Sequence, residues 1–187
     1  VDAAIAAALA SGVVQPSGSG LGGGGFALVV TPKGEARFLD FREVAPASAT
    51  RDMYASGASS TVGPLAVAVP AEGIGLADLH RRWGRADLAT VAAPAISLAR
   101  DGFGIGRHLA ASLLQVPMEG LFGEGNRRPG LALALEAWRD TGGEAFRTGW
   151  VAEDFVAATG AAVTLADLSG YAVKERAHIR FDILMNM

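Results

Sequence analysis

Apolar residues recur at helical spacing over residues 1–14, the first segment of the chain. Ile5, Leu9 and Gly12, together with Ala8, fall on one face of such a helix. Most of the other positions are alanine, the best helix former. Pro16 cannot continue a helix, because it lacks a backbone N–H and its ring clashes with the preceding turn. We therefore predict an N-terminal helix that packs closely through one face.

The spacing then changes to that of two strands. Residues 26–30 are apolar at every position, which predicts a strand covered on both faces. Residues 36–41 alternate in character and predict a second strand. Between them, residues 31–34 read Thr-Pro-Lys-Gly, which is typical of a tight turn. We expect an antiparallel hairpin that ends at Arg42 and Glu43.

After residue 46 the pattern is mostly helical. Asp87 is expected to cap one helix, within which Pro94 should cause a kink or begin a second helix. Thr164 and Asp167 resemble a capping box. Residues 47–64 and 116–130 are expected to be mainly loops. Helices are predicted at 73–83, 88–100, 106–115, 131–139 and 150–158, and strands at 65–70 and 174–184.

A glycine-rich run, residues 18–25, lies between the predicted helix and the hairpin. It contains G-x-G-x-x-G twice, but a dinucleotide-binding loop follows a strand and opens a helix, whereas the order here is reversed. A P-loop would also need a lysine. The run therefore predicts a hinge with positive φ angles and close backbone approach.

The composition is that of a globular chain. Of 187 residues, 50% are apolar and 19% charged, and the net charge of −3 argues against a nucleic-acid or membrane-surface partner. The absence of cysteine excludes disulfides and thiolate chemistry. Residues 1–14 are too short to span a bilayer and lack the basic start of a signal peptide. A chain that begins without methionine suggests a processed product or a fragment.

Few residues offer catalytic or metal chemistry. His80, His108 and His178 lack ligand-like spacing, so we expect surface or interhelical roles and predict no metal site. Neither Ser17 nor Ser19 forms a G-x-S-x-G nucleophile motif. We assign no catalytic residue and no cofactor to this chain.

Arg42 is the strongest candidate for a binding residue. One interpretation is a surface ion pair with Glu43, Asp40 or Asp52, which contributes only about 0–1 kcal/mol. The other is a carboxylate clamp, because a guanidinium meets a carboxylate with two parallel hydrogen bonds. Position alone leaves both open.

Several segments resemble the large-subunit start of the γ-glutamyltranspeptidases. They are VDAAIAAALASGVV, GLGGGGFALVV, LDFREVAPASATRDMY, LAVAVPAEGIGLADLHRRWGR and APAISLARDGFGI, with a weaker match from residue 145 to 176. The combination of GGGGF, LDFRE-x-AP and AVAVP is specific, and the resemblance covers nearly all of residues 1–176.

The resemblance implies an α+β fold, part of the αββα sandwich of N-terminal-nucleophile hydrolases. We expect one domain over 1–187, an incomplete large subunit: 1–46 form the helix, glycine hinge and hairpin that carries Arg42, and 47–187 are mostly helical. It also implies that Arg42 binds the α-carboxylate of the γ-glutamyl donor.

The resemblance further implies a self-cleaving precursor and a partner. The nucleophile would be the N-terminal Thr of a small subunit from the same precursor, absent from this chain, and a γ-glutamyl-enzyme ester would pass to water or an amino acid. Glutathione is the expected donor, and a periplasmic or secreted location is expected. Two alternatives remain open: a cephalosporin acylase-like or other amidohydrolase of the same family, and a non-catalytic γ-glutamyl-binding homologue.

Overall fold

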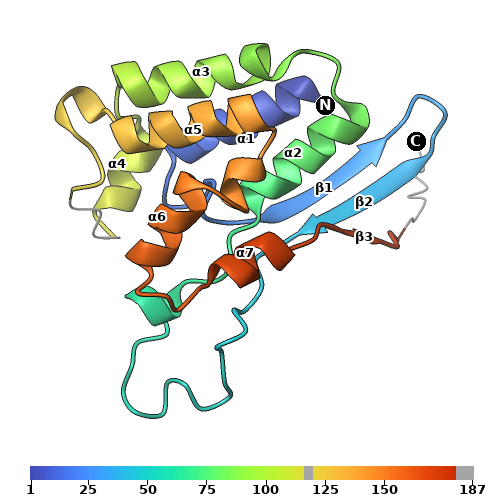
Figure 1. Cartoon of the computed structure of the whole chain (residues 1–187). Helices are drawn as coiled ribbons and strands as arrows, with labels where there is room; N and C mark the ends of the chain where they lie inside the picture. The colour runs from blue at the N-terminus through green and yellow to red at the C-terminus, as the bar shows by residue number, and fades with distance from the viewer. Residues whose placement is uncertain (116–119, 180–187) are drawn as a thin grey trace, which may run out of the picture.

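A computed structural model describes residues 1–115 and 120–179, in which helices pack on one side of a small sheet (Figure 1). The helices are α1 (Asp2–Val14), α2 (Glu72–Trp83), α3 (Leu88–Asp101), α4 (Arg107–Leu113), α5 (Pro129–Thr141), α6 (Trp150–Ala158) and α7 (Leu165–Gly170). Short 3-10 helices lie at Pro64–Ala66, Glu124–Asn126 and Glu144–Phe146. The strands are β1 (Gly25–Val30), β2 (Ala36–Phe41) and β3 (Lys174–Arg176).

The predicted hairpin is confirmed. Strands β1 and β2 are antiparallel, with Gly25 opposite Phe41 at one end and Val30 opposite Ala36 at the other. The turn closes with a hydrogen bond from the Gly34 amide to the carbonyl of Thr31. Strand β3 adds to the free side of β2, so the order in the sheet is β1-β2-β3.

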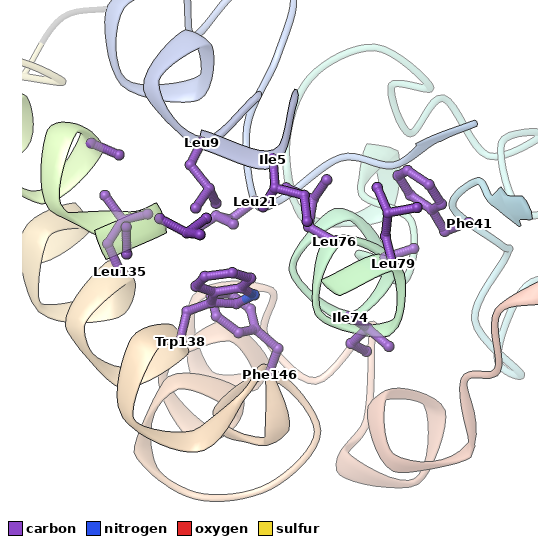
Figure 2. Packing of buried hydrophobic residues seen from close by; sticks show 14 of the residues in the cluster. Ile5, Leu9, Leu21, Phe41, Ile74, Leu76, Leu79, Leu135, Trp138 and Phe146 are labelled. Carbon is purple, nitrogen blue, oxygen red and sulfur yellow. The ribbon is translucent and has the colours of Figure 1, made fainter. Parts of the chain in front are cut away.

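The predicted first helix is also confirmed, and it contributes to one continuous core. Ile5 and Leu9 of α1 are buried and point toward α2 and α5, as Figure 2 shows. Trp138 of α5 is fully buried, and its indole N–H donates to the carbonyl of Gly73 over 2.7 Å. This bond satisfies a polar atom inside the core and fixes α5 against the first turn of α2.

Both predicted helix caps form. The Asp87 carboxylate accepts a hydrogen bond from the Thr90 amide, and Thr164 and Asp167 make a reciprocal capping box. Helix α3 then continues through Pro94, so a second helix does not begin there. Buried residues on both sides of the proline explain this, because their packing offsets one lost backbone hydrogen bond. They are Val91, Ala92, Ala95, Ile96 and Ala99.

The expectation that β1 is covered on both faces is wrong for the described residues. Phe26, Leu28 and Val30 are 57%, 59% and 61% exposed, while Ala27 and Val29 pack against the core. Helix α2 covers the inner face of the hairpin, and no described element covers the outer one. The apolar run at residues 26–30 shows that both faces of the strand are apolar. It does not show that elements of this same chain cover both faces.

Two other strand predictions need correction. Residues 65–70 do not form a strand: the chain makes the 3-10 turn Pro64–Ala66 and one isolated bridge, between Val44 and Val69. Pro64 and Pro70 bound too short a segment to build a ladder. Of the strand predicted at 174–184, the structure has residues 174–176, and residues 180–184 lie outside the described part.

Candidate functional site

The backbone of Arg42 is fixed where β2 ends. Its amide donates to Asp40 Oδ1 over 3.0 Å, and its carbonyl accepts from the Tyr171 hydroxyl over 2.9 Å. Asp40 is held in turn by Arg176, whose Nε lies 2.7 Å from Asp40 Oδ2. These hydrogen bonds also hold the pKa of Asp40 below its ordinary value, so the carboxylate stays charged.

The side chain of Arg42 is only partly committed. Its Nε lies 3.1 Å from Glu43 Oε2, and its guanidinium lies 5.9 Å from the centre of the Phe26 ring. Glu43 Oε2 is buried and receives no well-aligned hydrogen bond from the described residues. The contact between Arg42 and Glu43 is therefore an ion pair without hydrogen-bond geometry. More than half of the Arg42 side chain, 55%, stays exposed and can meet a ligand.

The glycine run approaches the end of β2 so closely that a side chain would not fit. A methyl group on Gly24 would lie 2.4 Å from the carbonyl oxygen of Phe41 and 2.9 Å from the amide nitrogen of Glu43. The expected close backbone approach is therefore confirmed. The expected positive φ is found in this run only at Gly20, where φ is 148°.

The same run is fastened to two helices. The carbonyl of Gly23 accepts from the amides of both Ala71 and Glu72, each over 2.8 Å, at the start of α2. Gly12, near the end of α1, packs so tightly on Gly20 that a methyl group there would lie 2.8 Å from the Gly20 Cα. The loop is therefore a tightly packed part of the site and not a loose spacer.

Glu72 is a buried carboxyl behind this loop, with 7% of its surface exposed. It accepts from the Gly20 amide over 3.3 Å. Burial raises the pKa of Glu72 from 4.5 to about 7, and the neighbouring Glu43 carboxylate adds to the rise, while the Gly20 hydrogen bond opposes it. The group therefore changes charge near neutral pH.

Arg128 brings a second guanidinium to the loop. Its Nη1 donates to the carbonyls of Gly12 over 2.9 Å and Val13 over 3.3 Å, at the open end of α1. Its guanidinium also lies 5.8 Å from the ring of Phe122. Burial lowers the pKa of Arg128 from its ordinary value, which marks a charge partly removed from water.

These groups line one hollow of about 570 Å³. That volume lies within the range of small-molecule sites. Its wall carries two guanidinium groups, two carboxyl groups and the bare backbone of the glycine run. The residues concerned are Gly12, residues 16–24, Arg42, Glu43, Glu72, Arg128 and Leu131.

A second hollow, of about 600 Å³, lies against the opposite side of α2. Its cations are already engaged: Arg82 contacts Asp78 and Glu175, and Arg147 donates to the carbonyl of Tyr171. A ligand there would have to displace existing ion pairs. The hollow at the glycine run is therefore the better candidate.

His80 and Ser17, two of the histidine and serine candidates from the sequence, make contacts that stabilise the fold. The His80 ring bonds to the carbonyl of Ala86 over 2.8 Å, and Ser17 accepts from the Gln15 side chain. Within residues 1–115 and 120–179, no three acidic or histidine side chains are grouped as metal ligands. In the same part of the chain, no helix has the length and apolar character needed to cross a membrane.

Sequence reasoning missed Glu72, Arg128 and Tyr171. Glu72 gave a usable signal, because it is the single charge in an otherwise apolar stretch from Leu65 to Leu76. Tyr171 gave none, since it meets Arg42 across 129 positions of sequence.

Comparison with known proteins identifies the class. The sequence profile described as Gamma-glutamyltranspeptidase matches residues 1–185. The γ-glutamyltranspeptidase from Pseudomonas nitroreducens, solved in complex with L-DON, superposes with a TM-score of 0.87 at 32% identity, covering 99% of this chain and 62% of that one. The described fold is therefore a partial α+β domain of the N-terminal-nucleophile hydrolase fold, as the sequence predicted.

The chain belongs to the γ-glutamyltranspeptidase family. It is 37% identical to glutathione hydrolase 3 of Arabidopsis thaliana, covering 98% of this chain, and 32% identical to the glutathione hydrolase proenzyme of Escherichia coli, covering 97%. It spans about a third of the length of these relatives, 32% and 36%. A cephalosporin acylase from Bacillus halodurans is also similar, with a TM-score of 0.82 at 28% identity, covering 97% of this chain and 39% of that one.

Proposed function

We propose that this chain forms the donor-binding part of a hydrolase and transferase that acts on glutathione and related γ-glutamyl amides. The observation that carries the proposal is Arg42, whose backbone is fixed from two sides while more than half of its side chain stays exposed on the wall of the hollow. In this role Arg42 binds the α-carboxylate of the donor through two parallel hydrogen bonds.

The reaction needs a nucleophile from a second polypeptide. In the proposed mechanism, an N-terminal Thr of a small subunit from the same precursor attacks the γ-carbonyl carbon of the donor, and its own amine takes the hydroxyl proton. The amide C–N bond breaks, the leaving amine takes the proton, and a γ-glutamyl ester remains. Water or the amine of an acceptor then attacks the ester and returns the proton to the Thr oxygen.

The outer face of the hairpin supports such a partner. Phe26, Leu28 and Val30 form a row of exposed apolar side chains, and Phe38 stacks on Phe26 with ring centres 5.5 Å apart. Apolar patches of this kind mark interaction surfaces. Several relatives are named proenzymes, which is consistent with a precursor that is processed. A periplasmic or secreted location stays a prediction.

A cephalosporin acylase-like activity is the second candidate, and the similarity to the Bacillus halodurans enzyme favours it. An acyl group without an α-carboxylate would leave Arg42 without a ligand. Donor selectivity therefore distinguishes the two activities, and a non-catalytic binding homologue would turn over neither donor.

The test is a cycle of two enzymes and two donors. Arg42→Lys in the complete protein keeps the charge but loses the planar fork, so one of two hydrogen bonds is lost. We expect kcat/KM for a γ-glutamyl anilide to fall roughly ten- to a hundredfold. A 4-aminobutyryl anilide, which lacks the α-carboxylate, should lose little, because it never used the clamp.

Arg37→Lys is the matched control, because Arg37 lies on β2, the strand that leads to Arg42, and pairs with Glu175 at the surface. It should leave both donors unchanged. Equal losses for the two donors in Arg42→Lys would make Arg42 a structural residue and overturn the clamp.

A further inference from the structure

Arg128 is a charged group that the proposed mechanism does not use. It lies on the wall of the same hollow as Arg42, but it comes from a different part of the chain, at the residue before α5. Its only hydrogen bonds to the described residues are those of Nη1 to the two carbonyls at the end of α1, apart from its backbone contacts. It forms no ion pair with any described carboxylate.

The Arg128 guanidinium is half-buried, and its described neighbours are two carbonyls and the Phe122 ring, with no carboxylate among them. Removing a charge from water costs free energy unless an opposite charge or hydrogen bonds replace the water. In the hollow, Glu43 contacts Arg42, and the Glu72 carboxyl accepts from the Gly20 amide. The described wall therefore leaves the Nε and Nη2 groups of Arg128 available to an anion that enters from outside.

We infer that Arg128 binds a second carboxylate of the donor, at the end of the peptide that leaves when the γ-glutamyl bond breaks. This inference rests on the proposed function. A γ-glutamyl peptide such as glutathione carries two carboxylates, one on the glutamyl part and one at the peptide end. Arg42 and Arg128 each bind one of these carboxylates. The hollow therefore selects γ-glutamyl peptides over γ-glutamyl amides that have no terminal carboxylate.

A purely structural role is the competing explanation. Helix α1 has no basic residue in its last turn, so Arg128 supplies the positive charge that the C-terminal end of a helix favours. This role uses Nη1 alone and is compatible with ligand binding by the rest of the fork. Loss of the cap alone would lower stability and would affect all donors equally.

The experiment compares glutathione with its glycine amide in the complete enzyme. Both donors keep the glutamyl α-carboxylate, so the Arg42 clamp serves both. For Arg128→Gln we expect kcat/KM for glutathione to fall at least tenfold, with less than a twofold change for the glycine amide. Arg128→Lys, which retains a charge near the α1 carbonyls, should show the same selectivity loss with a smaller change in melting temperature.

Arg127→Gln is the matched control, because Arg127 is exposed, lies outside the hollow, and among the described residues its side chain hydrogen-bonds only to the carbonyl of Asp101. It should change neither donor. Equal losses for both donors in both Arg128 variants would show that Arg128 is only a helix cap. If the unaltered enzyme turned over neither donor, the proposed function would fail, and calorimetric binding of S-methylglutathione and its glycine amide would still test Arg128.

Discussion

The glycines of the loop have different roles, although the sequence presents them as one run. Gly24 lies against the end of β2, where an added methyl group would meet the carbonyl of Phe41 at 2.4 Å. Gly22 faces open space, with no atom within 4 Å of such a methyl group. The sequence predicted both positive φ angles and close backbone approach for this run, and at Gly24 the close approach alone is found.

We therefore predict opposite outcomes for two alanine substitutions. Gly24→Ala should destabilise the complete protein by about 1–3 kcal/mol, because the new methyl group forces the backbone apart. Gly22→Ala should be neutral or stabilise it by up to about 1 kcal/mol, since it restricts only the unfolded chain. Urea unfolding of the two variants measures the difference. Equal stability would mean that the loop accommodates the Gly24 methyl group without strain.

Glu72 makes stability depend on pH. Its pKa is raised from 4.5 to about 7 in the folded chain, so the folded state keeps a proton that the unfolded state has lost between these values. The free energy of unfolding that this group contributes is therefore fully present below about pH 4.5. It decreases as pH rises through about 7 and is constant above.

Glu72→Gln should remove this dependence. The amide stays neutral at all pH values and can still accept from the Gly20 amide. The variant should match the unaltered protein near pH 4.5 and exceed it by about 2–3 kcal/mol at pH 8. Melting temperatures between pH 4 and 9 measure the difference, with Glu153→Gln on the surface of α6 as control. A constant offset across this range would contradict the shifted pKa.

Elements were predicted well where their signals are local. The caps at Asp87 and Thr164 each lie within three residues of the amide they bind, and both form as predicted. The hairpin turn is equally local. The strand predicted at 65–70 failed, because strand formation depends on a partner that the segment itself does not specify.

The same distinction explains how much of the site could be predicted. Arg42 was identified from its position after β2 and from the family resemblance. Glu72 and Arg128 reach the hollow from α2 and from the start of α5. Their proximity depends on how α1, α2 and α5 pack together, and no spacing within one segment encodes it.

At the scale of the whole molecule, the outer face of the hairpin is the surface where we propose that the small subunit binds. Replacing Phe26, Leu28 and Val30 by Thr keeps β-forming residues but removes apolar area. We predict that the triple variant weakens association with the proposed small subunit roughly a hundredfold, at about 1 kcal/mol for each half-exposed side chain. Dilution of the purified complex, followed by activity and by the ratio of the two chains, measures this effect.

Leu133→Gln is the control, because Leu133 is 56% exposed and belongs to α5, which lies apart from the hairpin in Figure 1. It should leave association unchanged. If the triple variant stayed fully associated at the concentrations where the control does, the apolar face would not be the contact surface.

The carbonyl of Gly23 has a consequence for dynamics. This one oxygen accepts from two successive amides, Ala71 and Glu72, so a single backbone group links the glycine loop to the first turn of α2. Rotation of that peptide group would release both amides to solvent at once. Amide hydrogen exchange at these two positions therefore reports whether the loop is bound to α2. A ligand that holds the loop in place should slow both exchange rates together.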